Sequence, residues 1–199
     1  MEMKKYIRRT LIIYFIYLIT TGALIFLYFE DDALLYTYNP GIESYWSETT
    51  GPDQVVLIED WNDAWLGRMY LIENAEGTLD ISYFTVYKGV TTEAFFASLL
   101  EAADRGVQVR ILLDGIFHNL RGSYKGIKYA LVNHPNIELK FYEPLNLLKP
   151  WTLQNRLHDK YIIADNKFVM MGGRNIGDEY FLPAYDGERA YDRDIIIIN

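Results

Sequence analysis

The sequence contains no cysteine and only three histidines among its 199 residues. The absence of cysteine excludes disulfides, thiolate metal ligands and cysteine nucleophiles. Basic residues are in deficit, with 19 Lys and Arg against 27 Asp and Glu and a formal net charge of −8. Because general electrostatic binding of nucleic acid needs an excess of Lys and Arg, this balance disfavours nucleic acid as a partner. It does not exclude a single phosphate in a local basic pocket.

Apolar residues, in contrast, are abundant. Hydrophobic residues make up 50% of the chain and aromatic residues 16%. Disordered chains lack this much apolar surface, so the composition predicts a folded protein. After a membrane segment is subtracted, about 150 residues remain, which is enough for one domain with its own core.

The N-terminal region carries an uncharged apolar run at residues 11–29, LIIYFIYLITTGALIFLYF. At about 1.5 Å per residue, a helix of this length spans a hydrocarbon core of roughly 30 Å. Basic residues precede the run and acidic residues follow it: Lys4, Lys5, Arg8 and Arg9, then Glu30, Asp31 and Asp32. The positive-inside rule therefore predicts a cytoplasmic N-terminus and an extracytoplasmic remainder.

A cleaved signal peptide is the competing interpretation of this run. Its apolar region would be shorter and would end in small residues, which are missing here, so we favour a single-pass anchor in the cell membrane. We divide the chain into a basic N-terminus (1–9), a transmembrane helix (10–29), a linker rich in turn formers (30–54) and a folded domain (55–199).

Helical and strand patterns alternate through the folded domain. Helices are predicted over residues 62–75, 92–104 and 124–133, and strands over 78–86, 107–113, 137–142, 157–164, 168–171 and 194–199. In the first helix we expect Ala64, Trp65, Met69 and Ile72 to face the core. The alternation predicts an α/β fold, an α/β/α sandwich with a mixed β-sheet preceded by the membrane helix.

The most informative stretch is the predicted hairpin that contains His158 and Lys160. The two-residue period of a strand places both side chains on one face, about 7 Å apart. A neutral imidazole can attack phosphorus, and an ammonium group can stabilise charge on the non-bridging oxygens. Gly172 and Gly173 end the second strand and allow backbone to approach a ligand closely. Asn175 would follow at the same end of the hairpin and donate a further hydrogen bond.

Two carboxylates are candidates for supporting roles. Asp194 opens the last predicted strand and could hold the imidazole tautomer from its far nitrogen. Asp165 lies at the hairpin turn and is expected to shape that turn more than to touch substrate. This chemistry requires no metal and no cofactor, and the sequence has no carboxylate-rich or His-rich ligand cluster.

Other polar residues carry weaker expectations. Arg174 could contact phosphate or pair with Asp178 or Glu179. Asp114, at the end of a strand, could line the edge of the cleft or cap a helix. His118 and His134 fall in predicted loops and are expected to be solvated.

The spacing of these residues resembles the signature of the phospholipase D superfamily. His158-x-Lys160 is followed after four residues by Asp165, and after six more by Gly172-Gly173-x-Asn175. The run from Gly172 to Phe181, GGRNIGDEYF, most resembles bacterial cardiolipin synthases of the C type. The resemblance implies a covalent phosphohistidine, with His158 as nucleophile or as acid/base partner. It also implies phosphate binding by Lys160 and Asn175 beside Gly173, and the imidazole-orienting role at the position of Asp194.

The resemblance further implies a substrate and a second half-site. The substrate would be a membrane phospholipid, with phosphatidylglycerol and cardiolipin synthesis as the first choice. The family's site is built from two such motifs, whereas this chain has one. The second would come from the same longer chain or from a homodimer, and we favour an incomplete chain because it stops inside an Ile-rich strand. The alternatives are a metal-independent nuclease or phosphodiesterase and an inactive membrane-anchored half-domain.

Overall fold

The structure is a computed structural model that describes residues 2–24 and 51–199. Contacts divide the chain into two compact units. The first unit comprises Met1–Gly51 and Leu145–Asn155, and the second comprises Pro52–Pro144 and Arg156–Asn199. Residues 25–29 of the expected membrane span and most of the expected linker, 30–50, lie outside the described residues.

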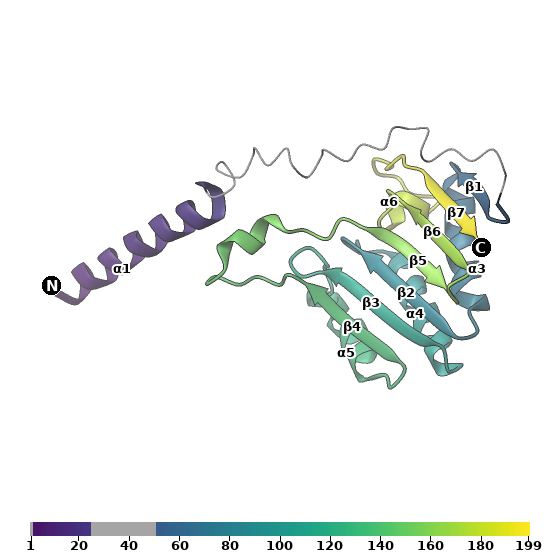
Figure 1. The fold of residues 1–199 in the computed structure, drawn as a ribbon, viewed down its shortest axis with the longest axis horizontal. Helices are drawn as coiled ribbons and strands as arrows, with labels where there is room; N and C mark the ends of the chain where they lie inside the picture. The colour runs from purple at the N-terminus through teal and green to yellow at the C-terminus, as the bar shows by residue number, and fades with distance from the viewer. Residues whose placement is uncertain (1, 25–50) are drawn as a thin grey trace. The chain divides into compact units, whose positions relative to one another are not determined.

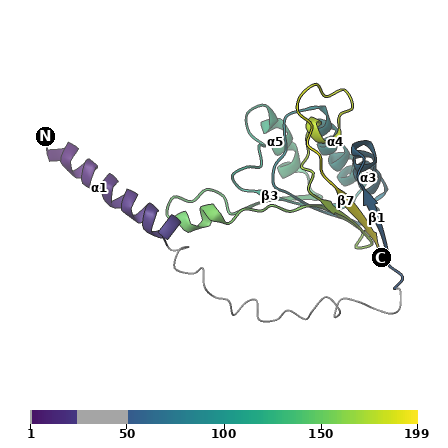
Figure 2. The same cartoon turned by 90° about the horizontal axis from the view of Figure 1, so that it is seen from above.

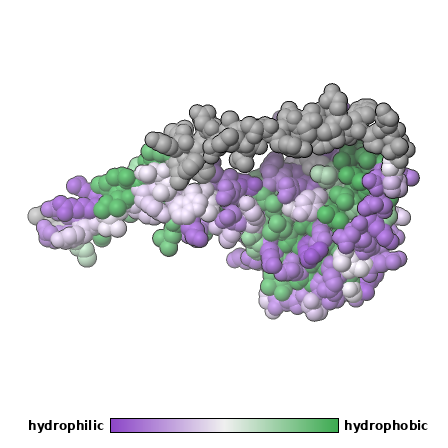
Figure 3. Space-filling model, in the orientation of Figure 1, coloured by the Kyte–Doolittle hydropathy of each residue, from purple (hydrophilic) through white to green (hydrophobic). Residues whose placement is uncertain are grey.

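The N-terminal element of the first unit is helix α1, Glu2–Ile19, which continues as the π-helical turn η1, Thr20–Leu24. Together they are long and apolar enough to cross a membrane. Hydrophobic side chains lie exposed along α1 (Figure 3). The helix begins eight residues before the predicted span, because the basic segment 2–9 is itself helical.

The second unit is built on one seven-stranded mixed sheet with the order β1-β7-β6-β5-β2-β3-β4 (Figure 1). β2, β3 and β4 run parallel, and the remaining neighbours pair antiparallel. The strands are β1 (Gln54–Ile58), β2 (Thr78–Tyr83), β3 (Gln108–Asp114), β4 (Ile137–Tyr142), β5 (Lys160–Ala164), β6 (Phe168–Gly172) and β7 (Asp194–Ile198). The α/β fold with a mixed sheet that the sequence predicted is therefore confirmed.

The helices of this unit lie against one face of the sheet (Figure 2). They are α3 (Trp61–Asn74), α4 (Val90–Asp104), α5 (Lys125–Asn133) and the single turn α6 (Asp178–Phe181). Alternate strand residues such as Leu79, Ile81 and Tyr83 point into the core beneath them. From α4, Phe95 and Phe96 meet this layer.

The buried face of α3 differs from the prediction at its centre. Trp65 and Met69 are only partly buried, whereas Arg68 between them is 1% exposed. From hydrophobic periodicity alone, a charged residue on a helix is predicted to face solvent. Arg68 is nevertheless accommodated because its guanidinium has carboxylate, hydroxyl and carbonyl partners inside the unit.

The observed strands differ from the predicted ones in the β5–β6 hairpin and at the edge of the sheet. Strand β1 was assigned to no element in the sequence, yet it pairs antiparallel along the whole of β7. β5 begins at Lys160 instead of Leu157. His158 therefore lies in the segment that leads into the strand, where its side chain is exposed.

The expectation that His118 and His134 are solvated is wrong. His118 is 4% exposed, its Nδ1 accepts the amide of Leu120 at 2.9 Å, and its ring lies 4.4 Å from that of Phe141. Burial, reinforced by Arg121 and other nearby cations, lowers the pKa of His118 from 6.5 to about 4. The Nε2 atom of His134 lies 3.1 Å from a carboxylate oxygen of Asp104. Both histidines gained partners from segments distant in sequence.

The β5–β6 turn is fixed by Asp165. Asp165 and Asn166 have positive φ angles of 53° and 56°. The Asp165 carboxylate accepts the backbone amides of Glu76, Gly77 and Thr78 at 2.8–2.9 Å, which ties the turn to the connection between α3 and β2. Burial raises the pKa of Asp165, but these three hydrogen bonds outweigh it and leave the pKa below its usual value.

Replacing Asp165 by Ala should therefore weaken folding. Three amides lose a charged acceptor, which we expect to cost about 2–3 kcal/mol of unfolding free energy. Because the folded-state pKa is lowered, the contribution is present above the unfolded pKa and is lost as the pH falls through the folded pKa. Thermal unfolding in detergent at pH 7 measures the loss. An unchanged midpoint would show that the turn does not depend on this carboxylate.

Candidate active site

The candidate site lies where β5 begins and β6 ends. Antiparallel pairing of these strands places Lys160 beside the end of β6, and β2 runs along the other side of β5. His158 is exposed just before the strand, and its ring centroid lies 4.9 Å from that of Phe84. The aromatic ring fixes one side of the imidazole and leaves the rest open to a reactant.

Lys160 is buried directly behind this histidine, at 5% exposure. Its Nζ donates to the carbonyl oxygen of His158 at 2.7 Å and lies 5.7 Å from the Phe84 ring centroid. Burial lowers the pKa of Lys160, and the carboxylates of Asp192 and Asp159 oppose that shift. An ammonium group in such a desolvated place attracts a phosphate oxygen more strongly than one in water does.

Asn175 lies in the loop after β6 and is 6% exposed. Its Nδ2 donates to the hydroxyl of Tyr180 at 3.3 Å, and among the described residues its buried Oδ1 has no partner. The loop is held by Ile176, whose carbonyl accepts the amide of Tyr87 at 2.7 Å. Since rotation of the amide exchanges its nitrogen and oxygen, the same pocket can present an NH₂ group to a ligand.

The two glycines allow a close approach, as expected, but the approaching segment is the start of β7. A Cβ added at Gly173 would overlap the carboxylate of Asp192, and one at Gly172 would overlap Asp194. The amide of Gly173 donates to the carbonyl of Arg193 at 3.2 Å. Larger residues at these positions would push β7 away from the site.

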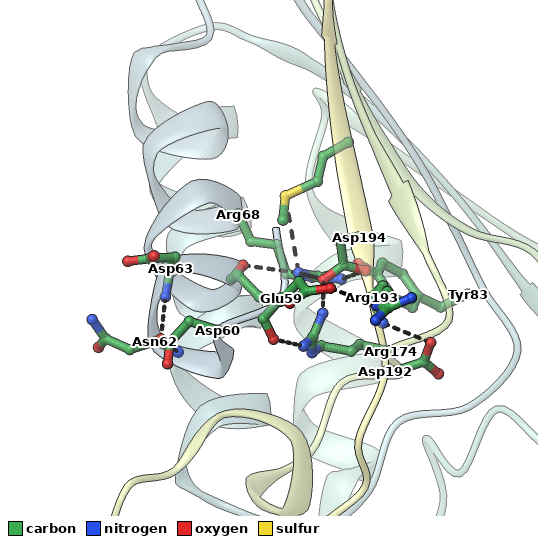
Figure 4. Close-up of polar contacts among 12 residues, drawn as sticks. Glu59, Asp60, Asn62, Asp63, Arg68, Tyr83, Arg174, Asp192, Arg193 and Asp194 are labelled. Carbon is green, nitrogen blue, oxygen red and sulfur yellow. Dashed lines mark hydrogen bonds and ion pairs between the residues drawn. The ribbon is translucent and has the colours of Figure 1, made fainter. Parts of the chain in front are cut away.

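Asp194 is buried between two arginines (Figure 4). Its oxygens accept from Arg68 at 2.9 and 3.0 Å and from Arg174 at 2.8 Å. Arg68 also donates to the hydroxyl of Tyr83 at 3.1 Å. These contacts place the Asp194 carboxylate inside the core, where its hydrogen bonds go to the two arginines and not to the imidazole of His158.

Arg174 faces inward rather than toward a substrate. Besides Asp194 it donates to the carbonyl oxygen of Glu59 at 2.6 Å (Figure 4). Both earlier interpretations, a phosphate contact and a pair with Asp178 or Glu179, are therefore wrong. Arg174, which follows Gly173 in the sequence, therefore anchors the loop that carries Asn175.

Two further carboxylates cap backbone around the site. Asp178 accepts the amide of Thr91 at 2.9 Å and its hydroxyl at 2.7 Å, at the start of α4. Asp114 is fully buried, accepts the amide of Leu157 at 3.1 Å and pairs with Arg156 at 3.1 Å. Because Leu157 immediately precedes the candidate nucleophile, Asp114 positions the backbone that carries it.

Asp192 is a carboxylate that the sequence analysis did not single out. It is exposed, lies against Gly173 and acts electrostatically on Lys160. The sequence D192-R-D194 contains two acidic residues at the start of the last strand. The imidazole-orienting role was predicted for Asp194, which the structure shows to be buried. Asp165, in contrast, lies at the opposite end of β5 from His158 and does not join this cluster.

In the part of the chain that the structure describes, no three His, Asp or Glu side chains gather to hold a metal ion. The polar groups near the start of β5 and the end of β6 are instead the His158 imidazole, the Lys160 ammonium, the Asn175 amide and the Asp192 carboxylate. Such a set can bind a phosphate diester and offer it a nitrogen nucleophile.

A family described as "Cardiolipin synthase, PLD-like domain" matches residues 69–198. The chain belongs to this phospholipase D-like family. Cardiolipin synthase C of Escherichia coli (strain K12) is 38% identical over 144 residues, which cover 68% of this chain. The chain spans 30% of the length of that relative.

Two solved structures share the fold of this phospholipase D-like domain. Nuc from Salmonella typhimurium, a phospholipase D family member, has a TM-score of 0.54 at 20% identity, covering 74% of this chain and 82% of its own. Phosphatidylserine synthase from Haemophilus influenzae Rd KW20 has a TM-score of 0.56 at 19% identity, covering 73% of this chain and 33% of its own.

Because Arg68 is buried with Asp194, replacing it should cost much more stability than the same replacement of an exposed arginine. Arg68→Met leaves the buried Asp194 charge with one partner, and we expect a loss of about 3 kcal/mol or more in unfolding free energy. Arg110→Met breaks an ion pair with Asp80 whose arginine is 60% exposed, and should cost far less because water solvates both partners. Chemical denaturation in detergent compares the two. Equal losses would contradict the role of the Asp194 network.

Proposed function

We propose that this chain supplies one half-site of a phosphatidyltransferase that acts on membrane phospholipid. The observation that supports the proposal is the exposed imidazole of His158 beside a buried ammonium, together with the buried side-chain amide of Asn175. The oxygen of that amide has no partner among the described residues, so the amide can turn and offer its NH₂ group to a phosphate. A diester phosphate would place its non-bridging oxygens on Lys160 and Asn175. Its phosphorus would then face the imidazole.

The first step transfers the phosphatidyl group to the protein. An imidazole nitrogen of His158 forms a bond to phosphorus while the bond from phosphorus to the leaving glycerol oxygen breaks. The leaving oxygen takes a proton from an acid, which the two-motif pattern assigns to the histidine of the second half-site. An acceptor hydroxyl, deprotonated by that same histidine, then attacks phosphorus and releases His158.

A carboxylate is needed to hold the imidazole in the reactive tautomer. We assign this role to Asp192 instead of Asp194. The oxygens of Asp194 are already engaged by Arg68 and Arg174. Asp192 is exposed, lies against Gly173 and acts electrostatically on Lys160, the neighbour of His158, which supports this assignment.

The substrate we propose is phosphatidylglycerol, and the product is cardiolipin when a second phosphatidylglycerol is the acceptor. Similarity to cardiolipin synthase C supports this choice. The second half-site would belong either to the same longer chain or to a second copy in a homodimer. Both sources supply the same group, a histidine that serves as acid and then as base.

We also propose that α1 anchors the protein in the cell membrane as a single span. The basic residues before the apolar run favour a cytoplasmic N-terminus and an extracytoplasmic catalytic domain. An anchor of this kind keeps the site next to a substrate that does not leave the bilayer. A nuclease has no need of this placement, and the net charge of −8 also disfavours it.

The proposal predicts lipid turnover that depends on His158. Purified chain in detergent with EDTA should convert phosphatidylglycerol to cardiolipin or phosphatidic acid when light scattering shows a dimer. A monomer should give no product until the second half-site is supplied. His158→Ala should abolish turnover because no nucleophile remains. Wild-type turnover by that variant, or cleavage of DNA with no action on lipid, would refute the proposal.

Two carboxylate variants separate the orienting residue from general charge effects. Asp192→Asn should lower kcat by at least about tenfold, because the imidazole loses its tautomer partner. Asp186→Asn removes an exposed carboxylate from the same connection between α6 and β7 and should leave kcat unchanged. Equal rates in both variants would return the role to Asp194.

A further inference from the structure

The segment between β4 and the candidate nucleophile exposes an unusual amount of apolar surface. Five large side chains of Leu145–Gln154 are exposed in the first unit: Leu145 at 59%, Leu147 at 60%, Leu148 at 76%, Trp151 at 37% and Leu153 at 41%. Burial of each would contribute roughly 1.5–3 kcal/mol, so leaving all of them in water is costly. Contiguous apolar surface of this kind marks a contact with a partner or a membrane.

This apolar segment packs against the C-terminal half of α1 and its continuation η1. The hydroxyl of Tyr14 donates to the carbonyl of Leu147 at 2.9 Å, and that of Tyr17 donates to Leu148 at 2.7 Å. Pro150 lies 3.6 Å from the position of a Cβ built on Gly22. Helix and segment thus form one unit, and α1 is the element long and apolar enough to cross a membrane.

Several backbone groups of the apolar segment have hydrogen-bond partners within the first unit. Two of its carbonyls accept the tyrosine hydroxyls of α1. The side chain of Asn146 accepts the amide of Leu148 at 3.0 Å, and residues Pro150–Gln154 form a 3₁₀ turn. In hydrocarbon every backbone polar group needs a partner within the protein, and irregular backbone is tolerated only where such partners exist.

We propose that Leu145–Gln154 inserts into the lipid bilayer beside α1, as a second membrane contact of the chain. The inference rests on the proposed anchoring by α1, whose exposed apolar surface continues onto the segment. Lys149 and Trp151 are residue types that favour the boundary between hydrocarbon and headgroups, where an ammonium group can meet lipid phosphate. The leucines then enter the acyl layer.

The C-terminal end of the inserted segment leads directly to the candidate site along the chain. Arg156 donates to the carbonyl of Glu143 at 2.9 Å and to Asp114 at 3.1 Å. Because Glu143 precedes the apolar segment and Arg156 follows it, the first of these bonds connects the two ends of the segment. His158 follows two residues later. Membrane insertion would therefore fix the part of the chain from which the nucleophile emerges.

Depth measurement on the full chain tests the insertion directly. Because the sequence has no cysteine, Leu148→Cys provides a single site for a nitroxide label. The labelled chain is reconstituted in vesicles of phosphatidylethanolamine and phosphatidylglycerol. Collision of the label with lipid-soluble oxygen and with a water-soluble nickel complex is then measured by electron paramagnetic resonance. We expect position 148 to favour oxygen strongly and to be protected from nickel.

Two matched positions calibrate the result. Val132→Cys replaces another exposed apolar residue, 55% exposed on α5, and should remain accessible to nickel. Ile12→Cys reports whether α1 itself lies in the bilayer. A lipid-exposed position 12 with a nickel-accessible position 148 would overturn the insertion while leaving the anchor intact. Protection of position 148 from both reagents would mean that protein covers it, and would also overturn the proposal. A nickel-accessible position 12 would refute the anchor and the insertion together.

Discussion

The ion pairs of the buried Asp194 carboxylate with Arg68 and Arg174 are the interaction on which the rest of the second unit depends. They join α3, the first residue of β7 and the loop that follows β6. Through Arg174 they also reach the carbonyl of Glu59, just after β1. Two cations around one anion, all inside the core, leave little freedom, because moving any partner exposes an uncompensated charge to low dielectric. The position of Asn175, next to Arg174 in sequence, follows from this constraint.

The same logic of backbone held by buried carboxylates recurs around the site. Asp114 fixes the amide before His158, Asp178 fixes the start of α4, and Asp165 fixes the turn at the far end of β5. None of these three groups needs to touch a substrate. In the proposed mechanism His158, Lys160 and Asn175 meet the phosphate, and Asp192 orients the imidazole. These few residues would then act on a scaffold that the buried carboxylates hold in place.

Local patterns in the sequence predicted the three longer helices of the second unit and six of its seven strands, because periodicity and spacing are local properties. The spacing also placed Lys160 beside His158, whereas the place of Asn175 in the same site stays a prediction. Features that depend on distant partners were missed. Arg68 is buried only because Asp194, 126 residues away, receives it. β1 is a strand only because β7 pairs with it, and His118 is buried under Phe141 from another strand. The sequence alone did not distinguish the roles of Asp192 and Asp194, because it does not show which carboxylate pairs with Arg68 and Arg174.

The proposed mechanism requires that His158 becomes covalently attached to the phosphatidyl group during turnover. The decisive measurement is mass spectrometry of the chain, denatured in mild alkali during reaction with phosphatidylglycerol and then digested, since phosphohistidine survives in base. This mechanism predicts a modified peptide containing His158 that is absent without substrate. The added mass is that of a phosphatidyl group, or of a glycerophosphoryl group where the alkali has removed the acyl chains. Sustained turnover with an adduct on another residue, or with no adduct at any time point, would contradict it.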